Sequence, residues 1–305
     1  MRVRRVHLIR LVIVVLGLTL VGCAGGAGDA TDGRIGVVAS FYPLAEAAQQ
    51  VGGRLVSVTD LTPPGVEPHD LELTPDQLET IAQADLVLYL GGGFQPAVED
   101  ALSDASGTTL DVSRELRNLP VPSGESEASL TADPHVWLDP VLYSKIVGNV
   151  EATLAELRPS DAAVFSRNAK AFEDRLASLD QAYRTGLTDC TRDVIVTSHA
   201  AFGYLAERYG LKQEPISGLS PDAEPTPQHL ADLKALVERD HVTTIFTEEL
   251  VSPKVADTLA AETGTTTAVL NPLESLTPAE IRAGQDYVSV MQANLQELRK
   301  ALDCT

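Results

Sequence analysis

The sequence predicts an α/β fold of two lobes, each built on a mainly parallel sheet and joined by a single long helix. Three observations lead to this prediction. Short apolar segments alternate with helical segments in the first half of the chain, as is typical of a parallel α/β layer. The second half repeats the alternation. Between the halves lies a long stretch, 160–187, whose apolar residues recur near helical spacing and whose other faces carry about equal acid and base.

The first residues have the features of a targeting segment. Four arginines accompany an uninterrupted apolar stretch of twelve residues, 11–22. A helix needs about 20 residues to span a bilayer, so this stretch fits the apolar region of a signal peptide over 1–22. It ends in Leu-Val-Gly-Cys, which resembles a bacterial lipobox and implies cleavage before Cys23 and lipidation of that residue. Residues 23–33 are expected to form a flexible tether that holds the body outside the cytoplasm.

The N-terminal lobe is expected to cover 34–158. Its predicted strands are short apolar runs at 35–40, 55–61 and 85–90. Its predicted helices lie at 41–51 and 74–84, and in the second of these Thr74 is the N-cap and Pro75 holds the first helical position. A polar loop follows at 118–133, and a helical pattern begins at 140.

The connecting helix and the C-terminal lobe follow. The helical pattern breaks near Pro159, and the connecting helix is expected to cover 159–187. The C-terminal lobe, 188–305, then repeats the order of strand and helix. Its strands are predicted at 193–197, 242–246 and 267–270, and its helices at 202–209, 227–239, 253–263 and 278–302.

Composition sets limits on function. A chain of 305 residues, 44% hydrophobic and 22% charged, is long enough for two lobes with sizeable cores. The formal net charge is −20, and removing the four arginines of residues 1–22 makes it −24. Binding to phosphates needs a basic face, so nucleic acid is not expected as a partner. An acidic surface suits solubility and also raises the local concentration of cations, so charge alone does not select a function.

The cysteines predict one disulfide. If Cys23 carries the lipid, Cys190 and Cys304 remain, and an even pair in an oxidising compartment is expected to be bridged. The bridge would close a loop of about a hundred residues, and the loop-entropy relation gives it roughly 4–5 kcal/mol. Without a Cys-x-x-Cys motif, a redox-catalytic pair is not expected.

Three histidines occupy similar local positions. His69, His135 and His199 each follow a strand or a turn and precede a helix, where open α/β sheets build their sites. A single histidine at such a position is usually a helix cap or a surface residue, but three of them favour a common site. His229 and His241 are interpreted as surface or structural residues.

Three motifs around these histidines resemble one family. They are Gly-Val-Glu-Pro-His-Asp at 65–70, Asp-Pro-His-Val-Trp-Leu-Asp-Pro at 133–140 and Thr-Ser-His-Ala-Ala-Phe-Gly-Tyr-Leu-Ala at 197–206. The chain resembles the metal-specific solute-binding proteins of bacterial ABC importers, in the zinc and manganese cluster. The likeness covers essentially the whole mature chain. It implies two α/β lobes joined by a single long rigid helix, with the metal site in the inter-lobe cleft.

The resemblance also implies a set of metal ligands. His69 and His135 match the ligands of the N-terminal lobe, and His199 matches the first ligand of the C-terminal lobe, where manganese members have a carboxylate. Glu274 best matches the fourth position, for which Glu248 and Glu249 compete; some zinc members leave that position to water. Three imidazoles and one carboxylate suit tetrahedral Zn²⁺, whereas Mn²⁺ prefers more oxygen ligands. Affinity is then expected to fall below about pH 6.5, where imidazoles become protonated.

The function implied is that of a monomeric, lipid-anchored protein that hands Zn²⁺ to an ABC permease and is not an enzyme. A zinc hydrolase is disfavoured because the chain has no His-Glu-x-x-His motif. A manganese-binding homologue and a surface adhesin with the same fold remain alternatives. The loop at 118–133 is short and lacks the histidines that many zinc members have there. Because it offers only Glu125, Glu127 and Asp133, no second metal site is expected on it.

Overall fold

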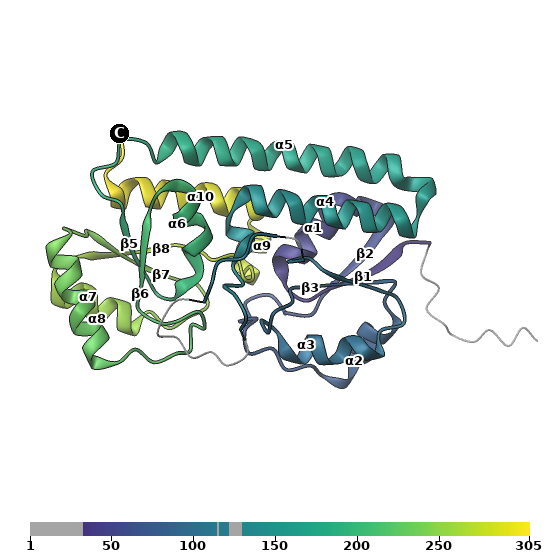
Figure 1. The fold of residues 1–305 in the computed structure, drawn as a ribbon, viewed down its shortest axis with the longest axis horizontal. Coiled ribbons are helices and arrows are strands. Elements are labelled where there is room, and N and C mark those ends of the chain that lie inside the picture. Colours follow the sequence, from purple (N-terminus) through teal and green to yellow (C-terminus); the bar gives the residue numbers. More distant parts are fainter. Residues whose placement is uncertain (1–32, 115, 122–129) are drawn as a thin grey trace, which may run out of the picture. The chain divides into compact units, whose positions relative to one another are not determined.

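A computed structural model describes residues 33–305, except for 115 and 122–129 (Figure 1). The predicted signal peptide, Cys23 and the tether as far as residue 32 lie outside the described residues, as do Glu125 and Glu127. Within the described ranges, every helix is too short or too polar to cross a membrane.

Two four-stranded parallel sheets form the centres of the two lobes. The first has the order β2-β1-β3-β4, and the second has the order β6-β5-β7-β8. The predicted α/β fold with parallel sheets is therefore confirmed. In each sheet the strand order reverses beside the first strand of that lobe, which has the second strand on one side and the third strand on the other. Open α/β sheets bind ligands at such a reversal. The strands are β1 Ile35–Ala39, β2 Val56–Asp60, β3 Leu86–Tyr89, β4 Thr108–Asp111, β5 Val194–Thr197, β6 Lys212–Pro215, β7 Thr244–Thr247 and β8 Thr266–Val269.

Helices connect the strands and cover the sheets (Figure 1). Thr74 is the N-cap of α2, as predicted, and it forms a capping box: its hydroxyl accepts from the backbone N–H of Gln77, and the Gln77 side chain accepts from the backbone N–H of Thr74. The helices are α1 Tyr42–Gly52, α2 Pro75–Gln83, α3 Pro96–Ala101, α4 Pro140–Leu157, α5 Ala162–Gly186, α6 Gly203–Tyr209, α7 Pro227–Arg239, α8 Lys254–Thr263, α9 Pro278–Arg282 and α10 Tyr287–Leu302. Single 3₁₀ turns include η3, Val136–Leu138, and η5, Ala200–Phe202.

Helix α5 is the predicted connecting helix. It has 25 residues and contacts α1 and α4 beside the first sheet and α10 beside the second. Its buried residues are those of the predicted apolar face, Phe165, Ala169, Phe172, Leu176, Leu179 and Tyr183. They belong to a hydrophobic core that contains residues of both lobes. We propose that the two lobes cover residues 34–158 and 188–305, and that the helical segment 159–187 joins them.

The closing segment differs from its prediction. The single helix expected at 278–302 is wrong, because α9 and α10 are separate helices. Gly284 adopts a positive φ of 72° between them, a conformation that breaks a helix, and Asp286 caps α10. The sequence also does not predict α3, β4 and β6. Helix α3 has only six residues, too few for a periodic pattern, and the two strands lie at sheet edges with polar, partly exposed residues.

The predicted disulfide is present. Cys190 and Cys304 are bridged across a sequence separation of 114 residues. The bridge joins the segment after α5 to the segment after α10, and it therefore ties the C-terminus to the start of the second lobe.

Candidate metal centre

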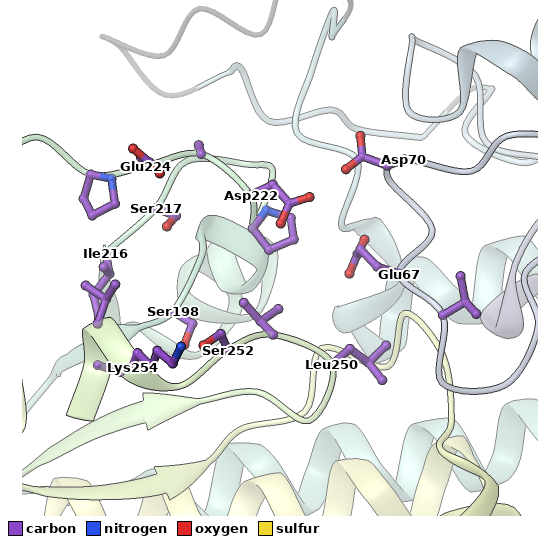
Figure 2. A pocket seen from close by; sticks show the side chains of 17 residues that line it. Glu67, Asp70, Ser198, Ile216, Ser217, Asp222, Glu224, Leu250, Ser252 and Lys254 are labelled. Carbon is purple, nitrogen blue, oxygen red and sulfur yellow. The ribbon is translucent and has the colours of Figure 1, made fainter. Parts of the chain in front are cut away.

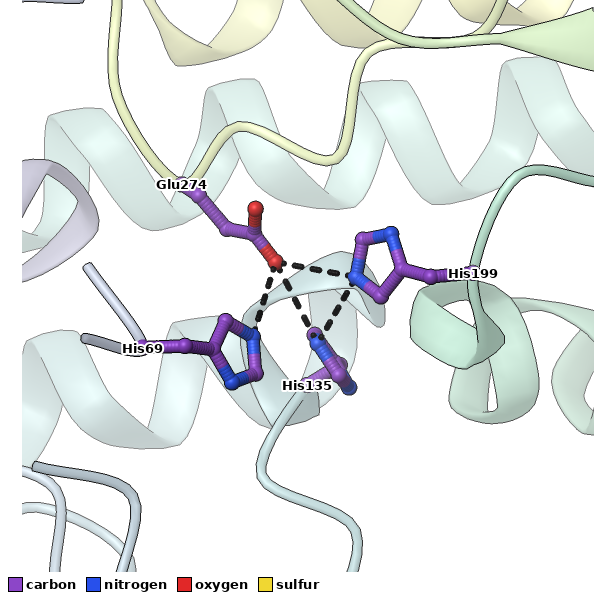
Figure 3. A group of neighbouring side chains, drawn as sticks. All are labelled: His69, His135, His199 and Glu274. Carbon is purple, nitrogen blue, oxygen red and sulfur yellow. Dashed lines mark hydrogen bonds and ion pairs between the residues drawn. The ribbon is translucent and has the colours of Figure 1, made fainter. Parts of the chain in front are cut away.

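Four side chains from four separate segments meet between the lobes (Figure 3). They are His69, His135, His199 and Glu274, and their potential ligand atoms all lie within 4.8 Å of one another. Oε1 of Glu274 lies 3.3 Å from Nε2 of His69, 3.3 Å from Nε2 of His135 and 3.1 Å from Nε2 of His199. The four residues that the resemblance implies as ligands are thus brought together.

Four of the six separations between these ligand atoms are close to those of a tetrahedral zinc site. Zn–N and Zn–O bonds of about 2.0–2.1 Å place neighbouring ligand atoms of a tetrahedron about 3.3–3.4 Å apart. The three distances to Oε1 of Glu274 are close to this value, and so is the 3.3 Å between Nε2 of His135 and Nε2 of His199. The donor atoms therefore surround a space that could hold a single small ion.

The centre is buried. His135 and His199 are 0% exposed, Glu274 is 1% exposed and the side chain of His69 is 5% exposed. A carboxylate without a partner would be costly at such a depth, and here it accepts hydrogen bonds from imidazoles of both lobes. An ion at this place would be removed from water and held by four protein groups.

Asp133 orients His135. The Nδ1–H of His135 donates to Oδ1 of Asp133 over 2.8 Å, which leaves Nε2 directed at the cluster. The sequence predicts Asp133 as one of the carboxylates of the polar loop. Its role beside the ring was missed, because the side chain is buried there and also accepts from the backbone N–H of His135. Its position two residues before a potential ligand in the Asp-Pro-His motif is the signal that could have identified it.

Glu248 has the same role for His199. Nδ1 of His199 lies 2.8 Å from both carboxylate oxygens of Glu248. Glu248 follows β7, which is the neighbour of β5 in the sheet, and His199 follows β5. Glu248 therefore contacts the far nitrogen of the His199 ring and does not belong to the cluster of potential ligands, and it is buried although Glu249 beside it is exposed. The pairing of β5 with β7 explains why the carboxylate and the imidazole meet.

His69 is held differently. Its backbone N–H donates to Oε1 of Glu67 over 2.9 Å, and its ring packs edge-on against Phe94 at a centroid distance of 4.7 Å. The preceding turn is tied to the other lobe, since the N–H of Gly65 donates to Oγ of Ser275. Burial, followed by the negative charge of neighbouring Glu274, raises the pKa of the Glu67 carboxyl.

The loop that carries Glu274 is fixed by hydrogen bonds. Leu273 adopts a positive φ of 58°, which is unfavourable for a branched side chain and is sustained only by its surroundings. The N–H of Leu273 donates to Oδ1 of Asn271 over 2.7 Å. Asn271 in turn exchanges two hydrogen bonds with Asn294 on α10. These contacts present Glu274 to the three histidines.

Trp137 links the two ligand-bearing segments. Its Nε1–H donates to the carbonyl of Pro272 over 2.8 Å, and its own carbonyl accepts from the hydroxyl of Tyr287 over 2.6 Å. Trp137 lies two residues after His135, and Pro272 lies two residues before Glu274. The spacing of His135 and Glu274 is thus set by a buried hydrogen bond between the lobes.

Replacing Trp137 by phenylalanine should loosen the centre. We expect Trp137→Phe to accelerate Zn²⁺ release about tenfold, because the carbonyl of Pro272 loses its donor and the Glu274 loop gains freedom. Release is measured by stopped-flow transfer to a chelator. Tyr143→Phe is the matched control, since it removes a buried hydrogen bond to Pro43 that does not touch the ligand segments. An equal acceleration in both variants would contradict this role of Trp137.

The protonation of the metal-free centre follows from its charges. Burial disfavours a charged His199, but the charges of Glu248 and Glu274 outweigh burial and raise its pKa well above the ordinary value. Burial also opposes protonation of His135, while its hydrogen bonds to Asp133 and Glu274 raise its pKa. For His69, burial dominates and lowers the pKa. Burial would raise the pKa of Glu274, yet the positive charge of His199 and the imidazole hydrogen bonds hold it well below the ordinary range.

Removing the charge of Glu248 should weaken the centre without removing a ligand. Glu248→Gln is expected to lower Zn²⁺ affinity about 10- to 100-fold, since the carboxylate orients His199 and increases the basicity of its ring. Affinity is measured by competition with a chelator. Glu249→Gln makes the same change at the adjacent exposed position and should leave affinity unchanged. Equal losses in the two variants would assign the effect to general electrostatics.

The remaining histidines of the body lie apart from the centre. The Nε2–H of His229 donates to the carbonyl of Pro215 over 2.8 Å, and His241 is exposed with a positive φ of 53°. Neither belongs to the cluster of potential ligands.

The chain is similar to one family along most of its length. The family described as "ZnuA: Zinc-uptake complex component A periplasmic" matches residues 37–301. The high-affinity zinc uptake system protein ZnuA of Bacillus subtilis is 38% identical over 288 residues, which cover 91% of this chain and 90% of that protein. The zinc-binding lipoprotein AdcA of Streptococcus pneumoniae is 38% identical over 299 residues, which cover 94% of this chain but 59% of AdcA. This chain therefore spans less than two thirds of that relative.

Solved structures agree with this similarity. Zn(II)-bound AdcA from Streptococcus pneumoniae superimposes with a TM-score of 0.78 at 39% identity, covering 89% of this chain and 58% of AdcA. The laminin binding protein of Streptococcus agalactiae, described as bifunctional with adhesin and metal transporting activity, gives a TM-score of 0.80 at 32% identity. That match covers 88% of this chain and 99% of the streptococcal protein.

Proposed function

This chain belongs to the family of the zinc-uptake complex component A, and on that premise we propose that it binds Zn²⁺ outside the cytoplasm and delivers it to an ABC-type importer in the membrane. The observation that carries the proposal is the cluster of three imidazole nitrogens and one carboxylate oxygen at the spacing of a tetrahedral zinc site. The ion is the cargo of the protein.

The donor set favours zinc over manganese. Nε2 of His69, His135 and His199 and Oε1 of Glu274 would be the ligands, with Asp133 and Glu248 holding the rings of two of them. Mn²⁺ prefers six oxygen-rich ligands, whereas imidazole suits Zn²⁺. A site with four protein ligands also leaves no open position for the water that a catalytic zinc activates, so transport fits better than hydrolysis.

The N-terminal segment supports a location of the protein outside the cytoplasm. The apolar stretch and Cys23 support a lipid anchor on the outer side of the cytoplasmic membrane, and the following residues provide a tether to the body at residue 34. The partner would be a permease that accepts the loaded protein and moves Zn²⁺ inward. A monomer is sufficient for this function, because residues of one chain complete the metal centre.

Metal content and uptake test the proposal together. The full chain, purified in mild detergent and stripped of metal, is expected to bind one Zn²⁺ per molecule and to retain it in the presence of excess Mn²⁺. Cells of the source organism whose gene for this protein has been deleted should take up less Zn²⁺ from zinc-limited medium. Expression of the wild-type protein in these cells should restore uptake. Stoichiometric binding without any effect on uptake would argue against delivery, while the absence of stoichiometric Zn²⁺ would overturn the proposal as a whole.

A further inference from the structure

A second feature lies beside the metal centre, a cavity of about 560 Å³ between the lobes (Figure 2). Glu67 and Asp70 line it from the N-terminal lobe, and Asp222 and Glu224 line it from the C-terminal lobe. Among the described residues of its lining, Lys254 is the one base. The carboxylates of Asp70, Asp222 and Glu224 against one ammonium make the cavity attractive to a cation.

The walls of the cavity are apolar between these charges. Ile216, Leu250 and Val251 contribute side chains to the lining. Val66 on one lobe and Val255 on the other also line it, and they are 42% and 39% exposed, two of the six large apolar side chains that are exposed in the described part of the chain. A hydrated metal ion gains nothing from apolar walls, whereas the aliphatic stem of a long cationic side chain packs against them.

The inner end of the cavity adjoins the metal centre through Glu67. Oε1 of Glu67 accepts from the N–H of His69, and Oε2 is buried on the side of the Glu274 carboxylate, with which the Glu67 carboxyl interacts. The charge of Glu274 acts on the Glu67 carboxyl, so the two groups are neighbours. Ser198, which precedes His199, also lines the cavity. A positive charge brought to this end would therefore stand next to the ion and its ligands.

We propose that the cavity receives an arginine side chain of the importer, and that its guanidinium beside Glu67 promotes the release of Zn²⁺. This inference rests on the proposed function and names the chemistry of the docking partner. Arginine fits because its planar fork offers five donors to several carboxylates at once, while its stem suits the apolar walls. Its charge repels Zn²⁺ and competes for Glu274, so docking and release become one event.

A capped peptide provides the probe. Acetyl-Gly-Arg-Gly-amide is compared with the same peptide carrying citrulline, which keeps the shape of arginine but has no charge. The arginine peptide is expected to bind the metal-free full chain in an NMR titration and to accelerate Zn²⁺ transfer from the loaded chain to a chelator about tenfold. The citrulline peptide should do neither.

Charge-neutral variants of the cavity locate the effect. The pair Asp222→Asn and Glu224→Gln lies outside the metal ligands and should abolish most of the peptide binding and the acceleration. The pair Asp232→Asn and Glu238→Gln makes the same change on exposed positions of α7 and should behave like the wild type.

Three outcomes would overturn the inference. The first is an equal effect of the citrulline peptide, and the second is an equal effect of the two variant pairs. The third is an equal acceleration by Mg²⁺ at matched ionic strength, which would make the cavity an entrance for hydrated cations. Failure of the proposed function appears separately, as a chain that holds no Zn²⁺ before any peptide is added. Peptide binding to the metal-free chain still tests the cavity in that case.

Discussion

Replacing His199 by alanine is expected to lower Zn²⁺ affinity by about a thousandfold or more, beyond the 10- to 100-fold that removal of an orienting partner costs. His199 offers one of the four potential ligand atoms and is 0% exposed. Without the ring, the ion would keep two imidazoles of the N-terminal lobe and Glu274, and a coordination position would face the space left by the missing side chain. Affinity is measured by chelator competition and metal content by elemental analysis of the purified full chain.

The His199 variant needs a control because Glu248 is buried against the ring. Removing the imidazole leaves this carboxylate only the backbone N–H of residue 199 as a partner, so the free energy of unfolding of the metal-free chain should also fall. His229→Ala serves as the control, since it removes a hydrogen-bonded histidine from the same lobe without touching the centre. It should retain one tightly bound Zn²⁺. If the His199 variant kept wild-type affinity while remaining folded, the four-residue centre would be wrong.

The parts of the fold that sequence predicts are those with strong local signals. The buried strands β1, β3, β5 and β7 are short runs of apolar residues, and the cap at Thr74 is followed by Pro75 at the first position of a helix. The apolar face of α5 recurs over 25 residues. In contrast, the edge strand β6 consists of Lys-Gln-Glu-Pro, whose hydrogen bonds to β5 are decided by tertiary structure.

The residues of the metal centre also divide into those that sequence motifs predict and those whose role depends on tertiary structure. The three histidines and Glu274 could be predicted from sequence motifs. Motifs that resemble those of a known family identify residues that belong to one site even when they lie far apart in the chain. The role of Asp133 was missed although it lies only two residues before His135, and the role of Glu248 was missed because it depends on which strand ends meet in space. Glu248 follows β7 and reaches His199 only because β7 pairs with β5. A linear sequence contains no signal for that pairing, although a polar residue at the end of a central strand is a reasonable candidate.

Acidification is expected to release Zn²⁺ at a higher pH than ordinary histidines would. The metal-free centre has raised pKa values at His199 and His135, so both rings carry protons at pH values where a free imidazole is largely neutral. Binding requires neutral rings and must expel these protons. Affinity therefore rises with pH until the raised pKa values are passed. The loss on acidification begins above about pH 6.5, the value that an unperturbed histidine predicts.

The size of the loss follows from the number of protons expelled. One proton per Zn²⁺ lowers affinity tenfold per pH unit, so the decrease from pH 7 to pH 5 is about a hundredfold for one imidazole and about ten-thousandfold for two. Glu274 adds nothing in this range because its lowered pKa keeps it ionised, and His69 has a lowered pKa and is already neutral near pH 7. Calorimetry in buffers of different ionisation enthalpy counts the protons directly.

Glu248 connects this pH dependence to the geometry. Its charge is the largest of the influences that raise the pKa of His199, so Glu248→Gln should bind Zn²⁺ more weakly but release fewer protons and show a shallower pH profile. Glu249→Gln should keep the wild-type slope. An affinity that stays constant from pH 7 to pH 5, or a slope that is the same in the Glu248 variant, would mean that these imidazoles are not protonated in the metal-free centre. Protonation and coordination would then not compete for the same Nε2 atoms, and acid release could not be attributed to the histidines.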